Sequence, residues 1–150
     1  MPDAQAIELL LVEDNPQDLE LALRALRKAN LTNRTHVARD GAEALDFVFG
    51  TGPFADRKMG DGLKVILLDL KMPKIDGLEV LRRLKTDART AVIPVVVLTS
   101  SREQRDVLES YRLGVNSYIV KPVNFEQYAA AVRDLGLYWL RLNQPSKVEE

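Results

Sequence analysis

Short apolar runs alternate along the chain with longer segments whose apolar residues recur at helical spacing. Residues 7–12, 65–68 and 92–98 are almost continuously apolar, which is typical of central parallel strands covered by helices on both faces. Two shorter runs, at 35–38 and 117–120, indicate more peripheral strands. Helical patterns lie at 16–29, 41–49, 77–86, 102–113 and 125–142. Five strands alternating with five helices predict an open α/β sheet with right-handed crossovers.

Local residues also predict where helices begin and where the chain leaves regular structure. Asn15 can cap the first helix, with Pro16 at its first position, because proline has no backbone N–H that needs a partner there. Ser101, with a glutamine three residues on, resembles a capping box, and Asn124 begins a weaker version. The Gly-rich segment 50–62 is too polar for a helix or strand and is expected to be a long surface loop.

Composition narrows the class of protein. The chain has 150 residues, 46% of them hydrophobic, and a net charge of -1, which fits one globular domain and lacks the basic balance of a nucleic-acid binder. Without cysteine it can form no disulfide and no thiolate metal site. Neither a signal peptide nor an apolar run of the roughly 20 residues that cross a bilayer is present. We therefore expect a single cytoplasmic domain with no membrane partner.

Polar residues with a shared chemistry stand at the ends of the predicted strands. Glu13 and Asp14 follow the first strand, Asp69 the third, Thr99 the fourth and Lys121 the fifth. In an open α/β sheet, ligands bind beyond these carboxyl ends. Crowded carboxylates favour a hard cation such as Mg2+, and a carboxylate can attack phosphorus to form an aspartyl phosphate. The cation, the ammonium and the hydroxyl would stabilise the negative charge of the transferred group.

Each of these residues, taken alone, has a simpler structural explanation. Asp14 could simply be the cap of the next helix, and Asp69 could be an ordinary turn residue. Threonine commonly ends strands, as Thr99 does, and Lys121 could be a solvated loop lysine. Their joint occurrence at successive strand ends favours a binding site, since convergent polar groups mark such sites.

Four segments resemble the receiver domains of two-component response regulators. They are Leu9–Asn15, Leu67–Gly77, Val97–Ser100 and Tyr118–Pro122, and the resemblance covers about residues 6–135. It implies a flavodoxin-like receiver fold, a five-stranded parallel sheet in the order 2-1-3-4-5 with helices on both faces. The whole chain, 1–150, would be one receiver domain with an extended last helix and a short polar tail at 143–150.

The resemblance also implies how the phosphoryl group and the metal are held. Asp69 would accept the phosphoryl group from the phosphohistidine of a sensor histidine kinase. Asp14, Asp69 and the backbone carbonyl of Lys71 would bind Mg2+ directly. Glu13 stands where the family more often has aspartate, and it would bind the metal mainly through water.

A conformational switch is implied in the same way. Thr99 and Lys121 would contact the phosphoryl oxygens, with Thr99 swinging toward them. Tyr118, the family's switch aromatic, would rotate inward to fill the space that Thr99 leaves, although an aromatic packed against a helix is its simpler explanation. The bond between Lys121 and Pro122 is expected to be cis, as is usual in the family.

The end of the last helix is a candidate interaction surface. One stripe of this helix is expected to face the core, through Phe125, Tyr128, Val132, Leu135 and Trp139. Leu137, Tyr138 and Leu140 lie on other faces, and we expect them in a symmetric dimer interface together with the helix at 102–113. The alternative is that the helix end folds back on its own domain. The loop at 50–62 and the aromatic-rich end resemble regulators that partner bacterial phytochrome histidine kinases and carry no output domain.

Three other function classes were compared with this interpretation. A haloacid-dehalogenase-type phosphotransferase expects Asp-x-Asp at the nucleophile, whereas Lys71 stands at the third position. A receiver-like binding module that is not phosphorylated would not need the intact set of site residues. A nucleotide-binding protein would carry a Gly-rich phosphate loop, which the sequence lacks. His36, the single histidine, is interpreted as a strand surface residue, and we expect no enzyme activity beyond the protein's own phosphorylation and dephosphorylation.

Overall fold

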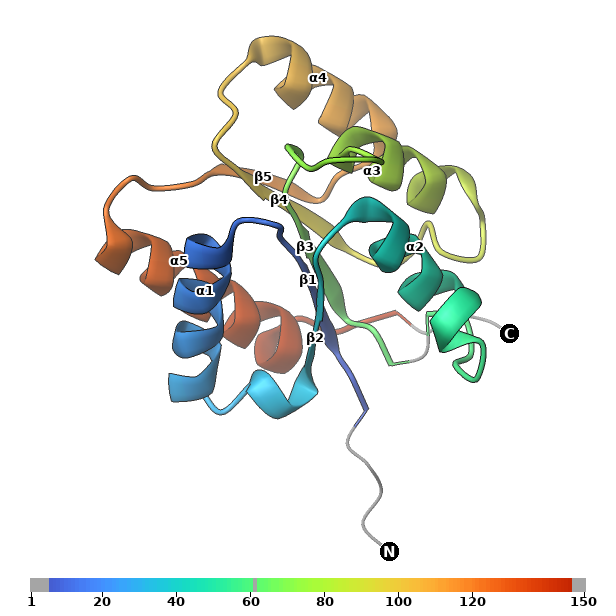
Figure 1. Cartoon of the computed structure of the whole chain (residues 1–150), viewed down its shortest axis with the longest axis horizontal. Helices are drawn as coiled ribbons and strands as arrows, with labels where there is room; N and C mark the ends of the chain where they lie inside the picture. The colour runs from blue at the N-terminus through green and yellow to red at the C-terminus, as the bar shows by residue number, and fades with distance from the viewer. Residues whose placement is uncertain (1–5, 61, 147–150) are drawn as a thin grey trace, which may run out of the picture.

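Five parallel strands form one sheet in a computed structural model that describes residues 6–60 and 62–146 (Figure 1). The strands are β1 Leu9–Val12, β2 Thr35–Ala38, β3 Val65–Leu68, β4 Val95–Thr99 and β5 Ser117–Val120. Their order, β2-β1-β3-β4-β5, confirms the predicted topology. Leu9 pairs with Thr35 on one side and with Val65 on the other, so β1 lies inside the sheet.

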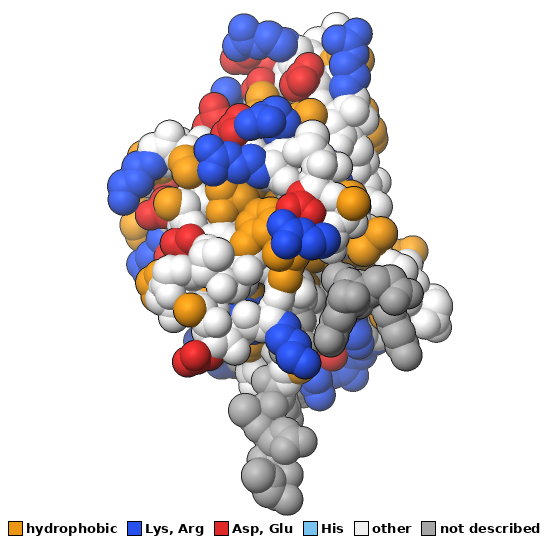
Figure 2. Space-filling view, turned by 90° about the vertical axis from the view of Figure 1, so that its right-hand side faces the viewer, with side chains coloured by type: hydrophobic (Ala, Val, Ile, Leu, Met, Phe, Trp, Pro, Cys, Tyr) orange, Lys and Arg blue, Asp and Glu red, His pale blue; other side chains and the backbone are white. Residues whose placement is uncertain are grey.

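Helices cover both faces of the sheet (Figure 1). They are α1 Pro16–Lys28, α2 Gly41–Phe49, α3 Gly77–Thr86, α4 Gln104–Leu113 and α5 Phe125–Leu137, with short 3-10 turns η1 Thr32–Arg34 and η2 Gly52–Phe54 and a π-helical turn η3 Tyr138–Leu142. The helices α1 and α5 pack together on one face, while α2 and α3 cover the other and α4 lies beside α3. The face over α2, α3 and α4 mixes basic and acidic side chains around a hydrophobic area, so it carries no patch of a single charge (Figure 2).

The side chains of each central strand divide between two cores. Leu10 and Val12 of β1 are buried on the side of α2 and α3, whereas Leu9 and Leu11 are buried on the side of α1 and α5. This alternation explains the continuous apolar runs of the sequence, because every position of a strand covered on both faces is buried. Within the described residues, the helices are too short and too polar to cross a membrane.

Most predicted helix starts are confirmed, and one is wrong. The side-chain oxygen of Asn15 accepts hydrogen bonds from the first backbone N–H groups of α1, and Asn124 accepts one in α5. The capping box at Ser101 is absent, because α4 begins only after Glu103. The Ser101 hydroxyl instead donates to the carboxylate of Asp106 at 2.6 Å. Ser101 lies too far from the helix start to cap it, and it binds a side chain inside the helix.

The segment at 50–62 is not entirely irregular. It contains the short 3-10 turn η2, whose Phe54 packs edge-on against both Phe47 of α2 and His36 of β2. His36 is therefore half-buried, stacked on Phe47 at 4.1 Å, where a surface position was expected. Burial lowers the pKa of His36 below its ordinary value. This aromatic packing holds the loop against α2 and β2. The composition of the loop alone does not predict the contact, because its partners come from other segments.

The chain end after α5 folds partly against its own domain. Leu140 is buried with the α1–α5 core, and Leu137 and Trp139 pack against the same cluster. Tyr138 remains 46% exposed. The expected core stripe is wrong at Phe125, which is 68% exposed because it is the first residue of α5, one turn before the buried part of the helix.

Candidate functional site

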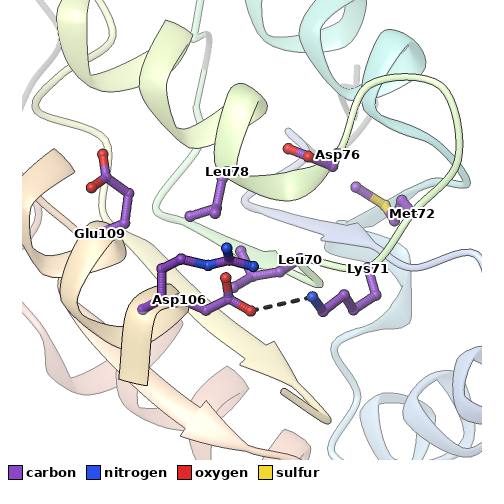
Figure 3. A pocket seen from close by; sticks show the side chains of 8 residues that line it. Leu70, Lys71, Met72, Asp76, Leu78, Asp106 and Glu109 are labelled. Carbon is purple, nitrogen blue, oxygen red and sulfur yellow. Dashed lines mark ion pairs between the residues drawn. The ribbon is translucent and has the colours of Figure 1, made fainter. Parts of the chain in front are cut away.

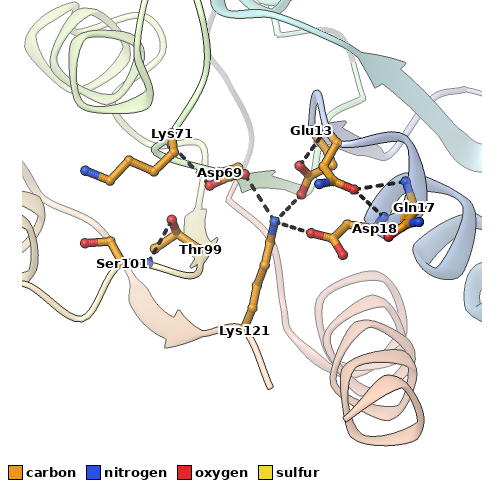
Figure 4. Close-up of polar contacts among 9 residues, drawn as sticks. Glu13, Gln17, Asp18, Asp69, Lys71, Thr99, Ser101 and Lys121 are labelled. Atoms are coloured by element: carbon orange, nitrogen blue, oxygen red, sulfur yellow. Dashed lines mark hydrogen bonds and ion pairs between the residues drawn. The ribbon is translucent and has the colours of Figure 1, made fainter. Parts of the chain in front are cut away.

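The predicted site residues meet at the carboxyl edge of the sheet (Figure 4). Backbone hydrogen bonds continue the parallel ladder by one residue beyond the strands, and they hold three of the site residues at this edge. The N–H groups of Glu13, Asp69 and Lys121 donate to carbonyls of neighbouring strands, at 3.0, 3.1 and 2.7 Å. Thr99 is the last residue of β4 and is fully buried. The strand register itself therefore places two acids, a hydroxyl and an ammonium side by side.

The Lys121 ammonium joins three carboxylates (Figure 4). Its Nζ lies 2.7 Å from Oε1 of Glu13, 2.8 Å from Oδ2 of Asp18 and 3.2 Å from Oδ2 of Asp69. Burial lowers the pKa of Lys121, but hydrogen bonds to Asp18 and Glu13 and the charge of Asp69 outweigh it and leave the pKa raised. The ammonium is therefore firmly protonated. Asp18 was not among the predicted site residues. It is an acid in the first turn of α1, and that position just after a strand end is the local signal that could have identified it.

The carboxylates fit a hard divalent cation. Glu13, Asp14 and Asp69 each offer an oxygen, and these oxygens lie within 4.8 Å of one another. Burial and the negative charge of Asp69 raise the pKa of Glu13 to about 7, despite the opposing effect of Lys121. Desolvation and the charge of Asp69 both disfavour an ionised Glu13, and a divalent cation would offset both effects. Asp14 is exposed, so one side of the cluster is open to solvent.

The two predicted switch residues both contact Ser101. The Thr99 hydroxyl oxygen accepts a hydrogen bond from the backbone N–H of Ser101 at 3.4 Å. The Tyr118 hydroxyl donates to the backbone carbonyl of Ser101 at 3.0 Å. The loop between β4 and α4 thus connects the buried threonine with the half-buried tyrosine on the next strand.

A pocket of about 430 Å³ lies next to the site, between α3 and α4 (Figure 3). Lys71, from the loop that follows β3, reaches across it to Asp106 of α4, with 3.2 Å between Nζ and Oδ2. The backbone N–H of Lys71 donates to Oδ1 of Asp69 at 3.2 Å. Sequence reasoning placed Lys71 beside the site but missed its partner, because Asp106 has no distinguishing local motif.

The expected cis bond between Lys121 and Pro122 is absent. The described residues contain no cis peptide bond, and the trans form is the favoured one even before proline. Lys121 reaches the carboxylates with this trans bond in place.

The fold and this edge define a class of protein. A parallel α/β sheet presents a buried aspartate beside two further acidic side chains, a buried threonine and a charged lysine. The chain belongs to the response regulator receiver domain family, whose model matches residues 9–133.

Known relatives agree with this assignment. The response regulator Rcp1 of Synechocystis sp. (strain ATCC 27184 / PCC 6803 / Kazusa) is 36% identical over 132 residues, covering 88% of each chain. Its Mn(2+)-bound structure matches with a TM-score of 0.84 and 34% identity over 93% of this chain and 98% of that one. The phosphorylated cyanobacterial phytochrome response regulator RcpA matches with a TM-score of 0.86 and 36% identity, covering 95% and 100%. The bacteriophytochrome response regulator AtBRR is 54% identical with a TM-score of 0.71, covering 93% and 99%. The protein is thus a receiver in phosphorylation-based two-component signalling, a system in which a histidine kinase is the partner.

Proposed function

We propose that Asp69 accepts the phosphoryl group, with Mg2+ held by Glu13, Asp14, Asp69 and the backbone carbonyl of Lys71. The observation that carries the proposal is the Lys121 ammonium, which lies 3.2 Å from Asp69 among carboxylates that fit a cation. In the proposed step, an Asp69 oxygen bonds to phosphorus as the phosphorus–nitrogen bond of the kinase's phosphohistidine breaks, and the bonding pair leaves with the imidazole. The cation supplies positive charge beside the transferred group.

The chain's own donors would then rearrange around the new anion. Lys121 turns one of its N–H groups from the carboxylates to a phosphoryl oxygen, and the Thr99 hydroxyl donates to another. Tyr118, whose hydroxyl donates to the backbone carbonyl of Ser101, moves into the space that Thr99 leaves. The chemistry is confined to the protein's own phosphorylation and dephosphorylation, and the output is a changed surface.

Intact-protein mass tests the phosphoacceptor. After incubation with Mg2+ and acetyl phosphate, we expect one added phosphoryl group in the wild type and in Asp134→Asn, a control that removes an exposed aspartate of α5. We expect none in Asp69→Asn and none without a divalent cation. A wild type that gains no mass would leave a receiver-shaped binding module, and a label on Asp69→Asn would reject the assignment of this residue.

The kinase partner is proposed to be a bacterial phytochrome. The support is that RcpA and AtBRR, by name a phytochrome and a bacteriophytochrome response regulator, match nearly the whole chain. Such a kinase uses ATP, which is available in the cytoplasm, so we place this protein there as well. Phosphoryl transfer from a purified bacterial phytochrome to this chain, compared with transfer from an unrelated histidine kinase, tests the assignment; equal rates from both would contradict it.

A homodimer through the chain end and α4 is the proposed output surface. Tyr138 and Leu142 are 46% and 77% exposed, and Leu108 and Tyr111 of α4 are about half exposed. Apolar side chains in such number usually meet a partner, and twofold pairing is the commonest assembly. Leu140 was predicted to join this interface, but its burial within its own chain leaves it little area to offer.

The mass in solution tests the dimer. Light scattering is expected to give a dimer for the wild type and a monomer for the variant Tyr138→Ala/Leu142→Ala. Phe125→Ala removes an equally exposed apolar side chain at the other end of α5 and should keep the dimer. A monomeric wild type, or a double variant that remains dimeric, would reject the proposed surface.

A further inference from the structure

The ion pair between Lys71 and Asp106 is unequal in its burial. The Lys71 side chain is 55% exposed, whereas the Asp106 side chain is 5% exposed. A lysine has a flexible stem and keeps an exposed ammonium at little cost, but a buried carboxylate depends on its partners. The pair therefore ties a mobile cation to a fixed anion on α4.

Asp106 is fixed by the loop that carries the switch residues. The Ser101 hydroxyl donates to its carboxylate at 2.6 Å, and this bond, together with Lys71, lowers the pKa of Asp106. The same Ser101 accepts from Tyr118 through its carbonyl and donates to Thr99 through its N–H. The Asp106 carboxylate is thus one step away from both switch residues.

Lys71 begins beside the proposed phosphoacceptor. Its backbone N–H donates to the Asp69 carboxylate at 3.2 Å, so the root of its side chain is adjacent to Asp69. A phosphoryl group on Asp69 would bring a charge of roughly -1.5 to -2 and three acceptor oxygens to this place. Two anions, one permanent and one added, would then lie within reach of a single ammonium.

We propose that Asp106 is a positioning residue that competes with the Asp69 phosphoryl group for the Lys71 ammonium. Without phosphorylation, the Lys71–Asp106 pair holds the loop after β3 against α4. The phosphoryl group draws Lys71 away, and the buried carboxylate of Asp106 and its bond to Ser101 are left to rearrange, which loosens the start of α4. This inference rests on the proposed function, since it needs a phosphoryl group on Asp69.

Thermodynamic reciprocity gives the sign of the effect. If phosphorylation must break the pair, then breaking the pair by substitution must favour phosphorylation. Asp106→Asn keeps the shape and can still accept from Ser101, but it releases Lys71. Because the lysine is half exposed, the pair is a modest one, and we expect the dissociation constant of the phosphoryl mimic beryllofluoride to fall roughly three- to tenfold.

Calorimetric titration with beryllofluoride and Mg2+ measures this dissociation constant in the wild type and four variants. Asp106→Asn should bind more tightly than the wild type, but the same substitution in a Lys71→Met background should leave the dissociation constant unchanged. Glu109→Gln, which removes a carboxylate from the same pocket one turn further along α4, should match the wild type. A merely structural role of Asp106 would give the same change in both backgrounds, and that result would overturn the proposal.

A second measurement covers the case in which Asp106→Asn does not fold. Lys71→Met alters an exposed side chain, and we expect its first α4 amides to exchange hydrogen as fast as those of the beryllofluoride-bound wild type. Unchanged exchange in Lys71→Met would refute the inference. A wild type that binds no beryllofluoride and takes up no phosphoryl group would instead refute the proposed function, so the two failures are distinguishable.

Discussion

We predict that Glu13 makes the metal-free protein less stable at neutral and alkaline pH than at acidic pH. Its pKa is raised from an ordinary 4.5 to about 7, because the side chain is buried and lies near the charge of Asp69. Glu13 therefore keeps its proton more readily in the folded protein than in the unfolded chain. This contribution to stability is complete at a pH below the pKa of the unfolded chain, and it is lost as the pH rises through about 7, the pKa in the fold. Since each pH unit between the two pKa values corresponds to about 1.4 kcal/mol, the full loss is about 3 kcal/mol.

Urea unfolding in the presence of a chelator, followed by the fluorescence of Trp139, measures this free energy from pH 5 to pH 8. Glu13→Gln resembles the protonated side chain, so its unfolding free energy should exceed that of the wild type by about 3 kcal/mol at pH 8 and by little at pH 5. His36, whose lowered pKa also makes stability depend on pH, is shared by both proteins and cancels in the difference. Added Mg2+ should stabilise the wild type more than the variant.

The reasoning would be refuted if the difference between the two proteins were the same at pH 5 and pH 8. It would also fail if Glu13→Gln were the less stable protein at pH 8 without metal. Either result would mean that burial does not raise the pKa of Glu13, and the argument that this edge needs a divalent cation would lose its electrostatic support.

Two further predictions concern Lys121 and the chain end after α5. Lys121→Met should leave the fold intact in the presence of Mg2+. It should slow phosphorylation by acetyl phosphate by about 100-fold, because a donor to the phosphoryl oxygens is lost. A rate within threefold of the wild type would contradict this prediction. Leu140→Ala should lower the unfolding free energy by about 2–4 kcal/mol, since it opens a cavity beside the α1–α5 core, whereas Tyr138→Ala should cost under about 1 kcal/mol in a monomeric background. Urea unfolding of both variants checks the second prediction, and equal losses would contradict it.

The sequence determined the elements and the edge at which the site lies. Continuous apolar runs such as 65–68 identify strands buried on both faces, and the sheet order followed from the family resemblance. Because parallel strands end at one edge of a sheet, the positions of Asp69, Thr99 and Lys121 just at the strand ends were enough to predict that they meet. Local capping by Asn15 was also predictable, since a cap needs only its own helix.

Only the tertiary structure decided which side chains pair across the site. Lys121 meets Asp18 from a helix 103 positions away, and Lys71 meets Asp106 of another helix. Ser101 was misinterpreted as a helix cap and Leu140 as an interface residue, because both assignments depend on how a helix is placed on the sheet. A pattern along the chain reports which face of a helix is apolar, but not how far the helix is shifted or turned on the sheet. The position of each helix is set by packing between distant segments. It decides whether a carboxylate lies close enough to pair with an ammonium and whether a leucine is buried in the core.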